Sequence, residues 1–166
     1  MHDDKLDQID LTILSLLQEK GRMKRNVLAE EVRLSIPSVS ERLRKLQEHG
    51  YIRNYRAILD PKRLGLEVGA YIVVISEASV HYDELVEKAL AHPEIIECHA
   101  VTGDGSHLLK VRTRSTSTLE RLLSEVQSWP GVKNTKTSIV LSSPKETTIL
   151  PLSHLEGKAH PPRGDK

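Results

Sequence analysis

The sequence is poor in aromatic side chains and in cysteine. It has no Phe, one Trp and four Tyr among 166 residues, so its core has to be built from Leu, Ile, Val and Ala. So few aromatic faces argue against a protein that stacks several bases or sugars on them. The single cysteine, Cys98, excludes an internal disulfide framework and every metal centre that needs several cysteines.

Long apolar runs and an excess of one charge are also missing. Runs such as Ala70–Ile75 fall far short of the roughly 20 residues that cross a bilayer. The first four residues contain neither a basic stretch nor an apolar signal core. We therefore expect a soluble, cytoplasmic protein with no membrane partner. The 24 Lys and Arg nearly balance the 23 Asp and Glu, so any contact with a polyanion must come from a local patch.

The spacing of the eight histidines indicates no metal site. None of them forms a His-x-x-x-His pair or a Glu-flanked zinc-binding helix. Cys98 and His99 are adjacent on an expected strand, so their side chains point to opposite faces. Phosphate-binding loops and Gly-x-Ser-x-Gly elbows do not occur either. We expect no metal, no cofactor and no catalytic residue.

The first fifty residues show helical periodicity only. A first helix is predicted to start at Asp7, whose side chain can cap it, and to end before Gly21. A second covers about residues 26–32. A third is capped by Ser35 and closed by Gly50.

The second and third helices have the spacing of a helix-turn-helix unit, with Arg33–Ser35 as the turn. From Arg33 to Arg56 there are six basic residues against two acidic ones, which favours docking on phosphates. A merely solvated helix face gives the same pattern, so the spacing alone leaves both interpretations open. The candidate DNA-binding residues are Arg33, Ser38, Ser40, Glu41, Arg42, Arg44, Lys45 and Arg53.

The rest of the chain alternates strand and helix patterns. Residues 51–58 predict a strand or small hairpin, and 60–65 form a joint rich in Pro and Gly. The order that follows is β-α-β-β-α-β, which predicts a four-stranded antiparallel sheet with two helices on one face. The predicted strands are 68–76, 95–101, 107–112 and 132–141, and the predicted helices are 82–91 and 117–128.

Several short motifs occur in a fixed order along the chain. The first half contains LDQIDLTILSLLQ (6–18), LAEEV (28–32), SIPSVSERLRKL (35–46) and GYI (50–52). The second half contains VTG (101–103) before LLKV (108–111), and PGV (130–132) before TKTSIVL (135–141). Over about residues 5–150 this series resembles the Lrp/AsnC, or feast/famine, family of bacterial and archaeal transcription regulators.

The resemblance implies an α+β protein. Its N-terminal winged helix-turn-helix domain (1–50) would be joined by a β-linker (51–66) to a ligand-sensing and oligomerisation domain (67–152). That second domain would be ferredoxin-like, of the RAM/ACT-like βαββαβ type. The end of the chain lacks apolar periodicity from Gly157 onward, and residues 153–166 are expected to be a disordered tail. The implied partners are double-stranded DNA, a small effector such as an amino acid, and further copies of the chain. The copies would form dimers that assemble to tetramers or octamers.

Two positions depart from the family pattern. Arg33 stands where the turn usually has Gly or Asn, so either the turn is regular or the residue is retained for a phosphate. After the Val-Thr-Gly turn, where the family has aromatic-Asp-aromatic, this chain has Gly105, Ser106 and His107. The same stretch also fits an ordinary Gly-rich turn. The resemblance implies effector contacts at Gly103, Asp104, Gly105, Ser106, Thr135 and Thr137.

Two other functions remain open from the sequence. Relatives in the wider superfamily decarboxylate sirohaem intermediates on the same architecture, and His99 and His107 could serve in such a pocket. The low aromatic content and the basic third helix argue against that enzyme. The third possibility is an effector-storage or assembly protein whose DNA binding is vestigial. It would show normal oligomers and no salt-dependent affinity for DNA.

Overall fold

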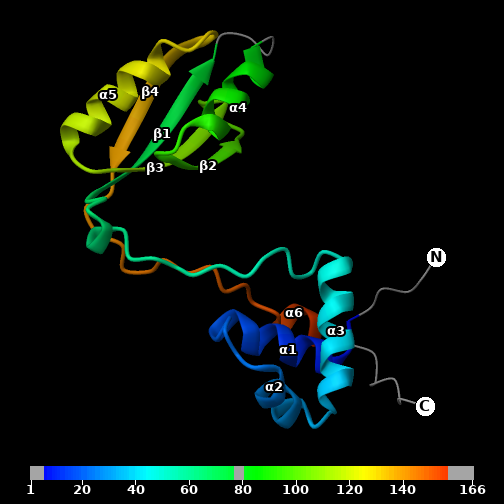
Figure 1. Cartoon of the computed structure of the whole chain (residues 1–166). Coiled ribbons are helices and arrows are strands. Elements are labelled where there is room, and N and C mark those ends of the chain that lie inside the picture. Colours follow the sequence, from blue (N-terminus) through cyan, green and yellow to red (C-terminus); the bar gives the residue numbers. More distant parts are fainter. Residues whose placement is uncertain (1–5, 77–80, 157–166) are drawn as a thin grey trace. The chain divides into compact units, whose positions relative to one another are not determined.

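The computed structural model describes residues 6–76 and 81–156 of the chain (Figure 1). The chain divides into two compact units. One comprises the residues up to Ile58 together with those from Glu146 onward, and the other is Leu59–Lys145. The first unit is helical, whereas the second is a sheet covered by two helices.

The helical unit consists mainly of three helices, as predicted: α1 (Gln8–Glu19), α2 (Arg25–Val32) and α3 (Ile36–Glu48). The side chains of Asp7 and Asp10 cap α1 reciprocally, because each accepts from the other's backbone N–H. The Ser35 side chain caps α3. The buried residues Ile13, Leu28, Ala29, Val39, Leu43 and Leu46 form the core of this unit.

The turn between α2 and α3 is not regular. Arg33 has φ 54° and ψ 43°, in the left-handed region. Its conformation lets the Leu34 N–H donate to the Ala29 carbonyl at 3.0 Å and so close the C-terminus of α2. Of the two alternatives for Arg33, the regular turn is therefore excluded. A long side chain occupies a position that ordinarily favours glycine.

The strand or hairpin predicted over residues 51–58 is absent. These residues form no strand ladder with any described part of the chain. Tyr51, Tyr55 and Ile58 are exposed. An alternating pattern becomes a strand only when its backbone finds a pairing partner, and no segment within residues 6–76 and 81–156 supplies one. A short 3₁₀ turn, η1 (Lys62–Leu64), follows.

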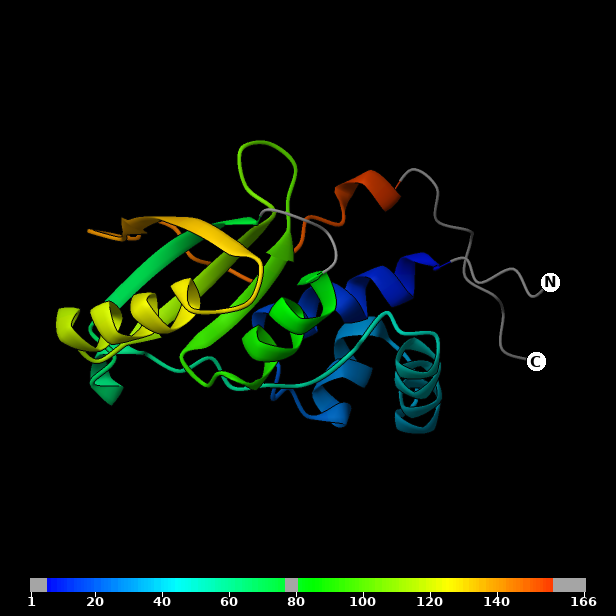
Figure 2. The same ribbon diagram turned by 90° about the horizontal axis from the view of Figure 1, so that it is seen from above.

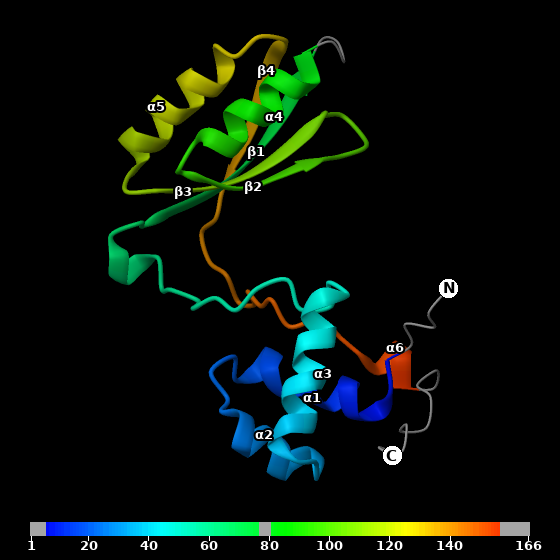
Figure 3. The same cartoon turned by 45° about the vertical axis from the view of Figure 1, so that its right-hand side comes forward.

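The second unit confirms the predicted β-α-β-β-α-β order. Four strands form one antiparallel sheet in the order β2-β3-β1-β4. Helices α4 and α5 lie on the same face of that sheet (Figures 2 and 3). The elements are β1 (Val68–Ser76), α4 (Tyr82–Ala91), β2 (Ile95–Ala100), β3 (His107–Thr113), α5 (Thr116–Gln127) and β4 (Val132–Ile139).

Strand β1 is apolar on both faces. Ala70, Ile72 and Val74 are buried in the core beneath the helices. Tyr71, Val73 and Ile75 alternate with them and point to the opposite face, which we call the open face of the sheet. Tyr71 is 38% exposed there. The open face thus keeps apolar area that the unit's own helices do not cover.

The C-terminal segment differs from the expected domain limits. The sensing domain was expected to reach residue 152, with disorder from 153, but the residues from Glu146 belong to the helical unit. Ser153–Glu156 form a short helix, α6. The Gln18 side chain on α1 donates to the Leu150 carbonyl at 3.2 Å and accepts from the Leu150 N–H at 2.7 Å. The rest of the expected tail, residues 157–166, lies outside the described residues.

Candidate DNA-binding and effector sites

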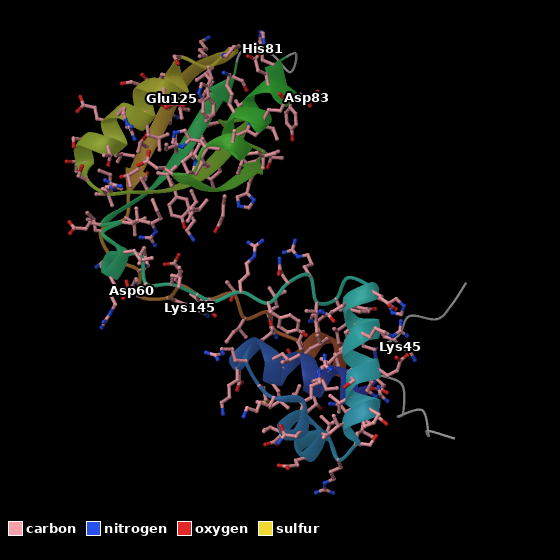
Figure 4. The ribbon with its side chains drawn as sticks, in the orientation of Figure 1. Lys45, Asp60, His81, Asp83, Glu125 and Lys145 are labelled. Atoms are coloured by element: carbon pink, nitrogen blue, oxygen red, sulfur yellow. The ribbon has the colours of Figure 1, made fainter. Side chains whose placement is uncertain are left out.

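The exposed face of α3 carries four charged side chains that contact one another. We call Glu41, Arg44, Lys45 and Glu48 the α3 quartet. Arg44 Nε and Nη2 donate to the two carboxylate oxygens of Glu41 at 2.8 and 2.7 Å, and Nη1 donates to Glu48 at 2.5 Å. Lys45 Nζ lies 3.6 Å from Glu41. Lys45 projects from α3 on the side away from α2 (Figure 4).

The contacts within the quartet hold Glu41 and Arg44 in their charged forms. Hydrogen bonding from Arg44, together with the charges of Arg44 and Lys45, lowers the pKa of Glu41 to about 2. The hydrogen bonds to Glu41 and Glu48 raise the pKa of Arg44 further above its usual value. Glu41 therefore stays an acceptor and Arg44 a donor under all conditions in which DNA binding is measured.

Arg42 occupies a different environment. Its Nη1 donates to Asp7 Oδ2 and to Asp10 Oδ1, both at 2.8 Å, and its side chain is only 16% exposed. It therefore bonds to the same two carboxylates that cap α1. We expected Arg42 among the DNA contacts. The helix twist instead places it on the flank of α3 that packs against α1, so it fixes one helix on the other.

The other candidate DNA-binding residues are Arg33, Ser38, Ser40 and Arg53, none of which belongs to the quartet. Ser38 shares a hydrogen bond of 2.8 Å with the capping Ser35 hydroxyl, in the first turn of α3. Ser40 is half-buried, whereas Arg33 and Arg53 are exposed. All four belong to the helical unit.

The loop between β2 and β3 is fixed to the sheet by its glycine at position 105. A Cβ atom at Gly105 would lie 2.3 Å from Val73 Cγ1 and 3.0 Å from the Val74 carbonyl oxygen, so only glycine fits. Gly103 has φ 109°, a conformation that also favours glycine. Asp104 is 91% exposed at its side chain and lies 3.7 Å from Lys136 Nζ. The loop thus presents one carboxylate on a tightly positioned backbone.

Ser106 points into the unit instead of out of the loop. Its N–H donates to the Val74 carbonyl at 2.8 Å, and its hydroxyl lies 2.5 Å from that of Ser76. The same hydroxyl is 3.0 Å from His107 Nδ1. The inward hydroxyl ties the loop to the end of β1.

His107 is buried, which its sequence position alone did not predict. It is 1% exposed, and its ring centroid lies 4.9 Å from that of Tyr82 on α4. Within the described residues, its Nε2 atom has no hydrogen-bond partner. Burial lowers the pKa of His107. The alternation of His107 with Leu109 and Val111 is the signal that places it on the helix-covered face.

Thr135 and Thr137 do not join the loop. In the β1–β4 register they lie opposite Val74 and Ile72, which puts them on the helix-covered side of β4. The Thr135 hydroxyl accepts from Gln127 of α5 at 2.9 Å. Four of the six expected effector residues therefore lie together, at 103–106, and the two threonines lie on the other face of the sheet.

Comparisons with known proteins match both units. Residues 6–53 match the family described as winged helix-turn-helix DNA-binding, and residues 70–150 match the Lrp/AsnC ligand binding domain. The chain is 38% identical to the HTH-type transcriptional regulator FL11 of Pyrococcus horikoshii over 147 residues, covering 89% of this chain and 97% of the relative. It is 39% identical to the proline dehydrogenase transcriptional activator of Rhizobium radiobacter, over 88% and 96% of the two chains.

A solved structure agrees with these relatives. The complex of a Neisseria meningitidis transcriptional regulator with L-Met superposes with a TM-score of 0.86 at 34% identity, over 90% of this chain and 99% of that one. The chain belongs to the Lrp/AsnC family of transcription regulators. Membership of this family makes the chain a DNA-binding regulator with a ligand-binding domain, and it excludes the sirohaem decarboxylase alternative.

No helix in residues 6–76 and 81–156 has the length and apolar character needed to cross a membrane. Over the same residues, no three His, Cys, Asp or Glu side chains are grouped so that they could hold a metal ion.

Proposed function

We propose that this chain controls transcription as a homo-oligomer. In this proposal α3 enters the major groove of DNA, and a small effector, an amino acid, binds at the loop of residues 103–106. The observation that carries it is the exposed, charged outer face of α3. This helix is capped at its start by Ser35 and held from behind by α1 through Arg42.

The DNA contacts divide by chemistry. Arg33, Lys45 and Arg53 are exposed cations suited to phosphates, which give affinity without sequence information. Ser38, Ser40, Glu41 and Arg44 lie on α3, the helix that we propose meets base edges. A dimer would place two copies of α3 in successive major grooves of a roughly palindromic site.

The open face of the sheet supports the homo-oligomer. Tyr71, Val73 and Ile75 are apolar residues on a face that the unit's own helices leave uncovered. A second copy of the same sheet would cover them. Residues 51–58, which belong to no strand ladder within the described part of the chain, offer a further place at which the backbones of two copies could pair. Further assembly of such dimers would give tetramers or octamers.

The effector assignment rests on the loop and on a relative. Backbone N–H groups at glycine turns suit a carboxylate, and the exposed Asp104 suits an ammonium group. A free amino acid carries both groups. The related Neisseria regulator was solved in complex with L-Met. The inward Ser106 leaves Asp104 as the side-chain carboxylate that this loop offers.

The test combines DNA binding with assembly. Replacing Lys45 with Ala should weaken binding to all duplexes and reduce the salt slope by about 0.9, as expected for one lost phosphate contact. Lys88→Ala on α4 removes the same charge from the other unit and serves as the control. Sedimentation with and without L-Met and other amino acids tests the effector. If Lys45→Ala leaves both the DNA affinity and the salt slope unchanged, the proposed docking of α3 on DNA is refuted. If the unsubstituted chain forms normal oligomers but has no affinity for DNA, it is an assembly protein.

A further inference from the structure

The α3 quartet holds two cations and two anions in one connected group. Glu41 contacts both cations, at 2.7 Å from Arg44 and 3.6 Å from Lys45. Glu48 contacts Arg44 at 2.5 Å. The quartet has no net charge, although the wider stretch from Arg33 to Arg56 is basic. The face of α3 that we propose meets DNA is therefore neutral.

A neutral face gives little sequence-independent affinity. Such affinity comes from cations that neutralise phosphates and release condensed counterions. Here two carboxylates already bond to the guanidinium of Arg44, so a phosphate has to compete with them for the same donors. The carboxylates also repel the phosphate backbone. General binding must then depend on cations that the carboxylates hold less closely: Lys45, 3.6 Å from Glu41, and Arg33 and Arg53 outside the quartet.

Base edges can provide new hydrogen-bond partners for both Arg44 and Glu41. Phosphate oxygens can only accept hydrogen bonds, so they can take the place of the carboxylates at Arg44 but cannot donate to Glu41. Guanine presents two acceptors in the major groove to an arginine, and cytosine presents an amino donor to a glutamate. Glu41 accepts from both Nε and Nη2 of Arg44, and these two parallel hydrogen bonds fix the orientation of the guanidinium. Exposed pairs of this kind are individually weak, so Arg44 can exchange partners at a suitable site.

We infer that Glu41 is a specificity-determining residue. It suppresses binding to arbitrary DNA by neutralising Arg44 and Lys45, and it directs Arg44 to sites where guanine accepts from the arginine and cytosine donates to the glutamate. This inference rests on the proposed docking of α3. It adds that an acidic side chain in the DNA-facing patch serves discrimination rather than affinity.

The experiment measures binding of the full chain carrying Glu41→Gln. The probes are a random-sequence duplex and the duplex selected in vitro by the unsubstituted protein. We expect affinity for the random duplex to rise about three- to tenfold, with a salt slope steeper by up to about 0.9 as Arg44 becomes available to phosphate. Selection with Glu41→Gln should replace cytosine by adenine at one position of each half-site, because glutamine pairs with adenine.

Controls separate this inference from the docking itself. Glu87→Gln removes the same charge from α4 and should leave both probes unaffected. In an Arg44→Ala background, Glu41→Gln should no longer steepen the salt slope, since the released cation is gone. If Arg44→Ala weakens binding but Glu41→Gln changes neither the random-duplex affinity nor the selected base, the inference is overturned and the docking stands. If neither variant changes binding to either probe, the docking of α3 is itself wrong.

Discussion

Arg33 gives the sharpest test of how the helix-turn-helix turn is built. Its left-handed backbone, with φ 54°, costs a residue other than glycine about 1–2 kcal/mol. Replacing it with glycine removes that strain but gives the unfolded chain more freedom, which destabilises by about 0.4–1 kcal/mol. The net expectation for Arg33→Gly is a helical unit more stable by about 0.5–1 kcal/mol.

Thermal unfolding of the full chain by calorimetry measures this difference. For a unit of this size, the expected stabilisation raises the melting temperature of its transition by about 2–6 °C. Arg33→Ala is the matched control, because it removes the same side chain and charge but keeps a Cβ atom in the left-handed region. If Arg33→Gly melts no higher than Arg33→Ala, the reasoning from backbone strain is refuted.

The same two variants test whether Arg33 contacts a DNA phosphate. If Arg33 contacts a phosphate, both variants should lose DNA affinity to the same extent and have a salt slope shallower by about 0.9. The melting temperatures of Arg33→Gly and Arg33→Ala would then differ, whereas their DNA affinities would be the same. A gain in stability with a loss of affinity would show why an arginine occupies a strained position.

Three other predictions follow from buried or long-range contacts. Arg42→Ala should destabilise the helical unit by about 1.5–3 kcal/mol, because it removes the charged hydrogen bonds to Asp7 and Asp10. The same variant should leave the salt slope of DNA binding unchanged. Gln18→Ala should remove both hydrogen bonds to Leu150 and increase amide hydrogen exchange at residues 149–155, whereas Gln8→Ala on the same helix should not. Burial lowers the pKa of His107, so the imidazole binds a proton more readily in the unfolded chain than in the folded one. The sheet unit should therefore lose stability as the pH falls below about 6.5. His107→Phe should remove that part of the pH dependence in urea unfolding, and His99→Gln should keep it.

The elements that follow from local chemistry were predicted closely from the sequence. Asp7 and Asp10 stand three residues apart and cap α1, and Ser35 caps α3. The limits predicted for the strand Val68–Ser76 and the helix Tyr82–Ala91 agree with the structure. Periodicity and capping act over a few residues, so a single sequence contains the information for both.

The features that were missed depend on partners far along the chain. Arg42 was assigned to DNA because its acidic partners lie 35 and 32 residues earlier. The docking of the segment from Glu146 depends on Gln18, 132 residues before Leu150. Thr135 and Thr137 were grouped with the loop because the resemblance implied it, and only the β1–β4 register shows that they face the helices.

Val73 connects the two proposed roles of the sheet unit. Its Cγ1 atom lies so close to Gly105 that a Cβ atom there would clash with it. This close contact positions the loop of residues 103–106 against β1. Its side chain also belongs to the open face, where it lies opposite Lys136. The Nζ atom of Lys136 lies 3.7 Å from the Asp104 carboxylate. A ligand that moves the loop must therefore move atoms of the face that we propose a second copy covers. Because linkage is reciprocal, assembly through that face must change ligand affinity by the same factor as the ligand changes assembly.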